Sequence, residues 1–216
     1  MWPFRKRVFN SAHQAIAEAS KYSSKDHWQR AYNGYSAAIG QLKGQIPGRD
    51  LARLYNERGF MARNIAIDLW NSGARVSYER WCAKAHQDYD AAIEADESYW
   101  RPWFNKGNLL ARDERRFQEA IPYLNKAAEL NPQHAEIFNN RGLTYESLGD
   151  NQAAMRDFKR AIAIDPKNAH AHSNIGTLLY EQGKYQEAAE WYEKAIRINP
   201  SDPVLRQNLQ LARSRI

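Results

Sequence analysis

The chain is poor in cysteine and has no long apolar segment, and both absences exclude whole classes of protein. Cys82 is the only cysteine among 216 residues, so no disulfide can form within the chain, which fits a reducing compartment. Nowhere does the sequence approach the roughly 18 consecutive apolar residues of a membrane-spanning helix. Residues 1–9 are basic but have no apolar stretch and no small-residue cleavage site, so we do not expect a secretory signal there. These features predict a folded, cytoplasmic chain.

Motifs that carry chemistry are also missing. The sequence has no Gly-rich phosphate loop, no zinc-ligand spacing and no nucleophile elbow. His170 and His172 are close in sequence, but His172 falls at a packing position, and Cys82 falls in an apolar stripe where a buried thiol is expected. We therefore predict no catalytic residue, no metal site and no cofactor, and classify the chain as a non-enzyme.

Excess positive charge is present only near the two ends. The chain has 31 Lys and Arg against 25 Asp and Glu, a formal net charge of +6. Three basic residues lie in residues 1–9 and three in residues 203–216, so the charges between those segments balance. Binding along nucleic-acid phosphates needs a continuous basic surface, and the sequence disfavours it. The aromatic and basic residues of 1–9 could lie on an anionic membrane surface, or could be a basic terminus that leads into the first helix.

What the sequence does contain is a repeat. Pro132, Pro166 and Pro200 are 34 residues apart, and Gly142 recurs at the same interval as Gly176. Within each period, two stripes of apolar residues with helical spacing are separated by a turn. A fixed period of this length indicates stacked helical hairpins rather than one globular core.

The repeated residues resemble those of the tetratricopeptide repeat (TPR) family, in which a large residue, Gly four residues later, an aromatic, Ala, an aromatic, Ala and Pro recur in order. Three consecutive segments match this pattern, with residues 100–133 supplying Trp103, Gly107, Leu110, Ala120, Leu124, Ala127 and Pro132; residues 135–168 supplying Phe138, Gly142, Tyr145, Ala154, Phe158, Ala161 and Pro166; and residues 169–202 supplying His172, Gly176, Leu179, Ala188, Tyr192, Ala195 and Pro200. The first of these segments has one extra residue in its turn, around Asp113 to Arg116. The resemblance implies an all-α fold, a right-handed superhelix of αα-hairpins.

The resemblance also suggests how the chain is divided. We expect a basic and aromatic segment at 1–9, a TPR solenoid at 10–201 and a capping helix at 202–216 that begins at Asp202 and Pro203. Five repeats are predicted, at 10–45, 51–98, 100–133, 135–168 and 169–201. Within each hairpin, small residues such as Gly176 and Ala188 should let the two backbones approach closely, with Tyr192 filling the space beside them.

The second repeat departs from the family pattern because it is longer. Gly59 and Ala85 are 26 residues apart, whereas Gly142 and Ala154, which match them, are 12 apart. Helical spacing continues on both sides of a turn at 71–73, so both helices should be longer by about two turns and the hairpin should project roughly 10 Å.

Two residues of this elongated hairpin carry specific predictions. Asp50 is a plausible N-cap of its first helix. Trp70, near its tip, either packs against Tyr78 or stays exposed as a secondary docking residue.

In the TPR family, the first helices of the hairpins line a concave groove that holds partner peptides. The matching positions in this chain are mostly amide, basic or aromatic, and they are Arg53, Asn56, Phe60, Arg63, Arg101, Phe104, Asn105, Asn108, Asn139, Asn140, Leu143, Ser173, Asn174 and Thr177. Asn105, Asn140 and Asn174 occupy equivalent places. An amide both donates and accepts hydrogen bonds, so a row of amides could hold a peptide backbone without reading its sequence, although Asn is also simply common at this position.

The basic groove positions favour an acidic partner at the amino-terminal half. Some members of the family hold a terminal carboxylate with two lysines, but Phe104 stands where one of these lysines is expected, so we do not predict that clamp. The sequence predicts a protein-interaction module, an adaptor or assembly scaffold that binds a peptide or helix in the groove. The alternative is a structural protein that self-associates through its elongated hairpin.

Overall fold

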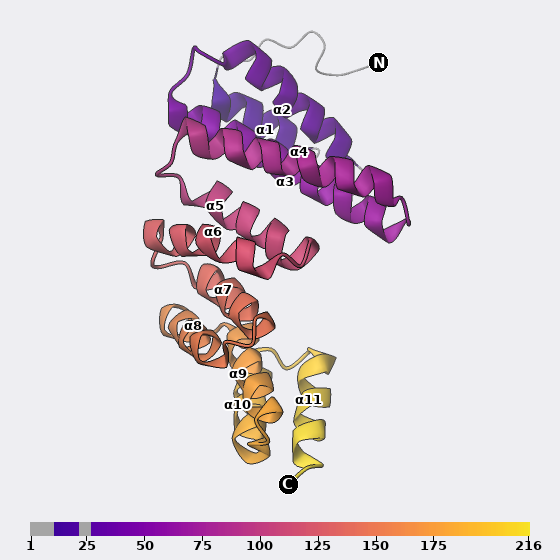
Figure 1. Ribbon diagram of the computed structural model, residues 1–216, viewed down its shortest axis with the longest axis vertical. Helices are drawn as coiled ribbons and strands as arrows, with labels where there is room; N and C mark the ends of the chain where they lie inside the picture. The colour runs from indigo at the N-terminus through magenta and orange to yellow at the C-terminus, as the bar shows by residue number, and fades with distance from the viewer. Residues whose placement is uncertain (1–10, 22–26) are drawn as a thin grey trace. The chain divides into compact units, whose positions relative to one another are not determined.

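The computed structural model describes residues 11–21 and 27–216, and in this part of the chain every regular element is helical (Figure 1). The chain divides into two compact units, residues 1–115 and 116–216. The fold is therefore all-α, as the sequence predicted.

The described residues of unit 1 form five α-helices and a short π-helical segment, η2. Their bounds are Ala12–Ser20 (α1), Trp28–Leu42 (α2), Gly48–Asn71 (α3), Arg75–Ala95 (α4), Trp100–Asn108 (α5) and Leu109–Asp113 (η2). The first four helices form two hairpins, α1 with α2 and α3 with α4. A shared core, which includes Ala12, Tyr35 and Leu54, joins the two hairpins.

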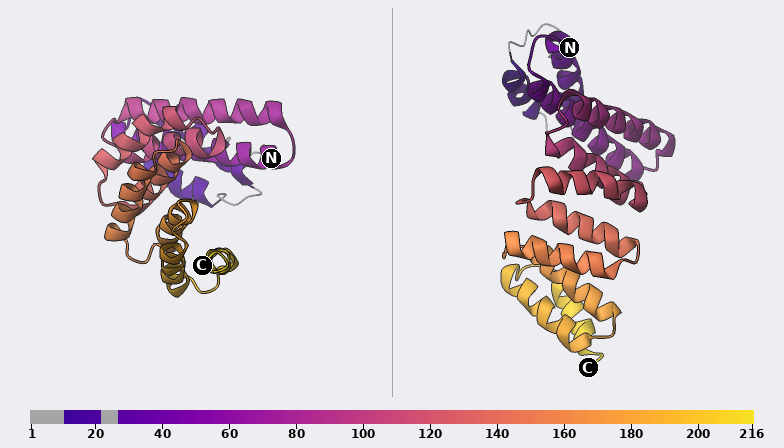
Figure 2. Two further views of the ribbon diagram at one scale, coloured as in Figure 1. Left: turned by 60° about the horizontal axis from the view of Figure 1, so that its bottom comes forward. Right: turned by 60° about the vertical axis from the view of Figure 1, so that its left-hand side comes forward.

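Unit 2 contains six α-helices. Their bounds are Phe117–Leu130 (α6), Ala135–Ser147 (α7), Asn151–Ile164 (α8), Ala169–Glu181 (α9), Tyr185–Ile198 (α10) and Pro203–Arg213 (α11). Helix α7 pairs with α8 and α9 pairs with α10, and α11 packs on α10, as the second view of Figure 2 shows. Asp202 accepts a hydrogen bond from the Val204 backbone N–H and caps α11, with Pro203 in its first turn.

The α3/α4 hairpin is longer than the others, as predicted. Helices α3 and α4 have 24 and 21 residues, whereas α7 and α8 have 13 and 14, and Figure 1 shows the pair extending past α5. Asp50 is not the N-cap of α3, because the helix begins two residues earlier, directly after Pro47. Asp50 lies in the first turn, where a carboxylate interacts favourably with the positive end of the helix dipole.

The extra residue of the third repeat is absorbed mainly by a change of helix type. The Glu114 backbone N–H donates to the Leu109 carbonyl at 3.1 Å, a five-residue step that defines a π-helical turn. Arg115, which follows, has a positive φ of 57°. The predicted insertion in the turn is therefore a wider final turn of the first helix, followed by one left-handed residue.

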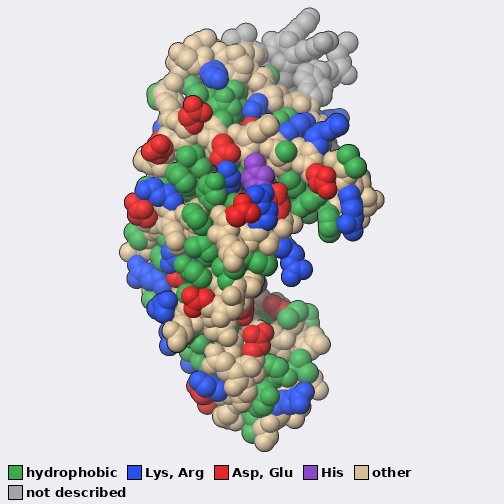
Figure 3. Space-filling view, viewed as in Figure 1, with side chains coloured by type: hydrophobic (Ala, Val, Ile, Leu, Met, Phe, Trp, Pro, Cys, Tyr) green, Lys and Arg blue, Asp and Glu red, His purple; other side chains and the backbone are tan. Residues whose placement is uncertain are grey.

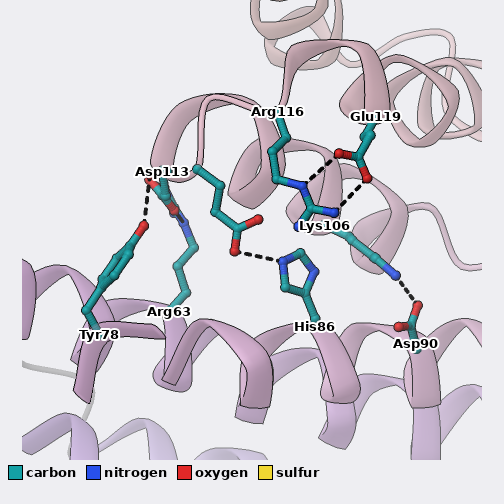
Figure 4. Close-up of polar contacts among 9 residues, drawn as sticks. Arg63, Tyr78, His86, Asp90, Lys106, Asp113, Arg116 and Glu119 are labelled. Carbon is teal, nitrogen blue, oxygen red and sulfur yellow. Dashed lines mark hydrogen bonds and ion pairs between the residues drawn. The ribbon is translucent and has the colours of Figure 1, made fainter. Parts of the chain in front are cut away.

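Side chains of the long hairpin bind this π-helical turn (Figure 4). Arg63 of α3 forms an ion pair with the Asp113 carboxylate, and the Tyr78 hydroxyl of α4 donates to the Asp113 carbonyl at 2.8 Å. His86 Nε2 lies 2.9 Å from Glu114 Oε1. Three contacts from two helices thus fix the irregular turn within unit 1.

The close contact inside each hairpin differs from the one the sequence suggested. A Cβ atom added at Gly142 would lie 2.6 Å from Cε1 of Phe158, and one added at Gly176 would lie 2.8 Å from Cε1 of Tyr192. The glycines therefore make room for the aromatic ring of the second helix, and the nearest atoms are not those of Ala154 or Ala188. The ring covers the glycine backbone because no side chain stands between them.

Candidate functional site

The first helices of the hairpins carry the predicted groove positions, and we describe them unit by unit. In unit 1 these helices are α1, α3 and α5, and in unit 2 they are α7 and α9. Contacts join α1 to α3 and α3 to α5 in unit 1, and α7 to α9 in unit 2. Side chains of successive first helices can therefore meet.

Asparagine amides link successive first helices in the same way in both units. Asn105 Nδ2 on α5 donates to Asn56 Oδ1 on α3 at 2.9 Å, and Asn174 Nδ2 on α9 donates to Asn139 Oδ1 on α7 at 3.0 Å. Asn56 and Asn139 are buried, whereas Asn105 and Asn174 are partly exposed. One amide of each pair thus holds the other in a fixed orientation.

Further bonds extend both pairs. Asn56 Nδ2 donates to Glu57 Oε1 at 3.2 Å, and Asn139 Nδ2 donates to Asn140 Oδ1 at 3.3 Å. Among the described residues, the side-chain oxygens of Asn105 and Asn174 accept no hydrogen bond, so each keeps its capacity as an acceptor.

Several other groove candidates are used in packing or ion pairing. Arg63 is engaged by Asp113, and the Phe104 ring lies 6.0 Å from Trp100 with 7% of Phe104 exposed. Asn108 is buried. Phe60 is partly buried against the core of unit 1.

In unit 2, the remaining candidates also lie against their neighbours. Leu143 packs against the core of this unit. Thr177 Oγ1 donates to the Ser173 carbonyl at 3.2 Å and lies 3.2 Å from the Tyr192 hydroxyl.

Arg53 and Arg101 come together at a pocket of unit 1 that the sequence did not indicate as such. The pocket has a volume of about 420 Å³ and is lined by Ile16, Arg49, Arg53, Glu57, Tyr99 and Arg101. Arg53 Nη1 lies 3.1 Å from His13 Nε2 and 3.8 Å from an Asp50 carboxylate oxygen. Arg101 is exposed, with its guanidinium 5.2 Å from the centre of the Trp100 ring.

Burial and nearby charges act in opposite directions on the acidic group of this pocket. Burial raises the pKa of Glu57 above its ordinary value, against the hydrogen bond from Asn56 and the charges of Arg101 and Arg53, which lower it. Burial likewise raises the pKa of Tyr99. The pocket is therefore basic, with one carboxyl group that burial disposes toward its neutral form.

The sequence does contain a signal for the asparagine pairs and for the arginine pocket. Arg53 and Arg101 each precede the glycine of their repeat, Gly59 or Gly107, by six residues. Asn105 and Asn174, which donate, precede the glycine of their own repeat by two residues. Asn56 and Asn139, which accept, lie in the preceding repeat and precede the glycine of that repeat by three residues. Comparison of positions between successive repeats, rather than within one, would have paired them.

At the tip of the long hairpin, Trp70 packs against Tyr78, as one of the two alternatives predicted, while its docking role stays a prediction. Its ring centre lies 5.0 Å from that of Tyr78, and the Arg75 guanidinium lies 5.0 Å from the Trp70 ring. Half of Trp70 is nevertheless exposed, as is 76% of Val76. The membrane contact proposed for residues 1–9 lies outside the described residues.

Among residues 11–21 and 27–216, no group of three or more His, Cys, Asp and Glu side chains could hold a metal ion. In the same part of the chain, no helix has the length and apolar character needed to cross a bilayer.

Taken together, paired helices, glycine–aromatic contacts and polar first helices define an αα-hairpin repeat protein. A model of the tetratricopeptide repeat family matches residues 80–135, 109–169 and 139–203, which together cover more than half of the chain. The chain therefore belongs to the tetratricopeptide repeat family, whose fold is that of a protein–protein interaction module.

Similar proteins support the fold. A tetratricopeptide repeat protein from Parabacteroides merdae superimposes with a TM-score of 0.71 at 19% identity, over 96% of this chain and 74% of that one. YrrB, described as a TPR protein with an unusual peptide-binding site, superimposes with a TM-score of 0.64 at 23% identity, over 94% and 92% of the two chains.

Among curated proteins, the peroxisomal targeting signal receptor of Candida albicans is 28% identical over 96 residues, which is 44% of this chain. The match spans only 15% of that receptor's length.

Proposed function

We propose that the chain is a non-catalytic adaptor or assembly scaffold that binds a partner peptide or helix along its first helices, which form the concave groove of the family. The supporting observation is the recurrent amide pair. In each unit, one Asn holds the next, and the outer amide presents a carbonyl oxygen that accepts no bond among the described residues. Such a preoriented acceptor can take a backbone N–H of a partner with little loss of side-chain entropy.

Two comparisons give this proposal context. YrrB is described as having an unusual peptide-binding site, and the Candida albicans relative is named as a receptor for a targeting signal. We extend to this chain the peptide-binding role that the description of YrrB states. We also propose a cytoplasmic location, since Cys82 is free and buried, as is usual for thiols in reducing compartments.

The amide pairs provide the test. Asn105→Ala combined with Asn174→Ala should remove both outer acceptors and leave the buried amides in place. We expect affinity purification from the native host, followed by mass spectrometry, to lose the specific partner in this double variant. Asn208→Ala, on the partly exposed face of α11, is the control and should recover the partner as the unaltered chain does. Equal recovery in all three proteins would exclude the amides from binding.

Self-association is the second candidate, and the tip of the long hairpin favours it. Trp70 and Val76 expose 50% and 76% of their surface there, and apolar side chains of this kind are common at interfaces between proteins. Light scattering on the purified chain separates the two proposals. A dimer that Trp70→Gln converts to a monomer would support self-association, whereas a monomer at high concentration would favour the adaptor.

Nucleic-acid binding receives little support from the charge distribution. On the face seen in Figure 3, basic and acidic side chains are interspersed over the helices of each unit and do not form a continuous basic stripe. Binding through phosphates would make the affinity for nucleic acid fall steeply with salt concentration, and we expect no such salt-dependent binding.

A further inference from the structure

The arginine pocket of unit 1 has features that go beyond a general peptide-binding surface. Its lining includes three arginines, one glutamate and Tyr99, around a volume of about 420 Å³. The three arginines differ in how far contacts within the fold already engage them.

Arg49 is used by the fold. Its guanidinium forms an ion pair with Asp96, donates to the Ser98 hydroxyl at 2.8 Å and lies 5.1 Å from the centre of the Tyr99 ring. These bonds tie the start of α3 to the segment that leads into α5. Arg49 therefore forms one wall of the pocket, and its ion pair with Asp96 and its bond to Ser98 hold it in a structural role.

Arg53 and Arg101 are only partly satisfied. The carboxylate nearest Arg53 is that of Asp50 at 3.8 Å, which is too long for a hydrogen bond, and its other partner is the imidazole of His13. Arg101 has no carboxylate within ion-pair distance among the described residues; its guanidinium lies 5.2 Å from the centre of the Trp100 ring, and its charge also acts on Glu57. Each guanidinium has five donors, so both keep most of their hydrogen-bonding capacity.

We propose that this pocket binds a carboxylate of the partner polypeptide, either an Asp or Glu side chain or a free carboxyl terminus, through Arg53 and Arg101. The inference rests on the proposed function, because it places an acidic group of the same partner. Arginine is well suited to this role, since its planar donors match the two oxygens of a carboxylate.

Glu57 explains why a carboxylate is favoured over a phosphate. A dianionic phosphate would meet stronger repulsion from Glu57 than a singly charged carboxylate does. The arrangement also differs from the lysine-based clamp of some relatives, because its cations stand six residues before the repeat glycine.

The test uses short extended peptides that carry a fluorophore, added to the full chain and followed by fluorescence anisotropy. One peptide alternates Ala and Glu and has an amidated end, one alternates Ala and Gln with an amidated end, and one alternates Ala and Gln with a free carboxyl terminus. The first and third peptides distinguish a side-chain carboxylate from a terminal one, and a single-stranded oligothymidylate reports on phosphate binding.

We expect at least one carboxylate-bearing peptide to bind, and Arg53→Gln and Arg101→Gln each to weaken it about tenfold, as loss of a charge-assisted hydrogen bond does. Glu57→Gln should strengthen binding severalfold, because it removes the repelling charge while retaining an acceptor for Asn56. Arg80→Gln, an exposed position on α4 away from the pocket, is the matched control and should bind unchanged. Far-UV circular dichroism melting curves establish that each variant is folded.

Several results would overturn the pocket assignment. They are absence of saturable binding by both carboxylate peptides, an equal loss in Arg80→Gln, or tighter binding of the oligothymidylate that the pocket variants abolish. If the amidated Ala/Gln peptide binds equally well and the arginine variants have no effect, the pocket is not used while peptide binding itself stands.

Discussion

Gly59 offers a sharp test of how the hairpins pack, because two glycines of unit 1 should respond to the same substitution in opposite directions. A Cβ at Gly59 would lie 2.8 and 3.0 Å from two ring carbons of Tyr89 and 3.1 Å from Cβ of Asp88. Tyr89 is fully buried, so its ring cannot swing aside into solvent. A Cβ at Gly40, in α2, would have no heavy atom within 4 Å outside its own helix.

The expected magnitudes follow from these distances. Alanine in place of glycine in a helix interior gains about 1 kcal/mol through backbone entropy, and Gly40→Ala should therefore stabilise the chain by up to that amount. Gly59→Ala has the same gain but must displace the Tyr89 ring by several tenths of an ångström. Overpacking of this kind costs about 1–3 kcal/mol, so after the gain of about 1 kcal/mol the free energy of unfolding should fall by up to about 2 kcal/mol.

Urea unfolding followed by far-UV circular dichroism measures both changes. A difference of about 2 kcal/mol between the two variants is large enough to exceed the error of the extrapolation. If Gly59→Ala stabilises the chain as much as Gly40→Ala does, the glycine–ring contact does not restrict the space in this hairpin, and our account of the packing is wrong.

Three further predictions concern charged and reactive groups. Arg58→Gln leaves the buried Asp88 carboxylate without its bidentate partner and should cost about 3 kcal/mol in urea unfolding, whereas replacing both residues with Met and Leu should restore much of that loss; an equally unstable double variant would contradict the ion-pair explanation. Burial raises the pKa of the Cys82 thiol to about 11, so Ellman's reagent at pH 8 should react slowly with the native chain and rapidly after unfolding, and fast native reaction would contradict its burial. Burial, followed by the charge of Glu181, raises the pKa of Glu146 to about 7 from 4.5, so the folded state holds a proton there that the unfolded state releases. This contribution to stability is therefore present below about pH 4.5 and is lost as the pH rises toward 7; the pH dependence of the urea midpoint should weaken in Glu146→Gln and persist in Glu136→Gln, an exposed control on the same helix.

The sequence was sufficient to predict the helical pairs because they depend on local signals. Helical spacing of apolar residues and the turn residues between the stripes specify each hairpin without reference to distant parts of the chain. The long second hairpin was predicted for the same reason, since apolar spacing continues on both sides of residues 71–73. These signals are short in range and repeated, so one reinforces another.

The predictions were wrong where the same residues allow two different local structures. At the start of α3, Asp50 is a good N-cap residue, but the helix begins directly after Pro47, and Asp50 takes its place in the first turn. At the third repeat, an extra residue can be placed in a loop or absorbed by a π-helical turn. The structure adopts the wider turn and closes it with Arg63, Tyr78 and His86, contacts between residues far apart in sequence.

The candidate site was only partly predictable because its geometry arises between repeats. The family pattern identified which helix faces could bind a partner, and this placed Arg53, Asn105 and Arg101 among the candidates. It did not show that Arg63 would form an ion pair with Asp113, or that Asn56 would be buried and bound by Asn105. Those outcomes depend on the spacing of successive helices, which no single repeat encodes.

The two polar arrangements of unit 1 have a consequence for the kind of partner that can use both. On α5, Arg101 and Asn105 are four residues apart, so they lie one above the other on the same face, about 6 Å apart along the helix axis. Successive residues of an extended peptide are about 3.3 Å apart. One residue whose backbone N–H reaches the Asn105 oxygen can therefore place its own acidic side chain, or that of a near neighbour, at Arg101. If both proposals hold, the amides bind the backbone without regard to sequence and the arginine pocket supplies the selectivity, so we expect the partner to carry an acidic residue close to the Asn105 contact.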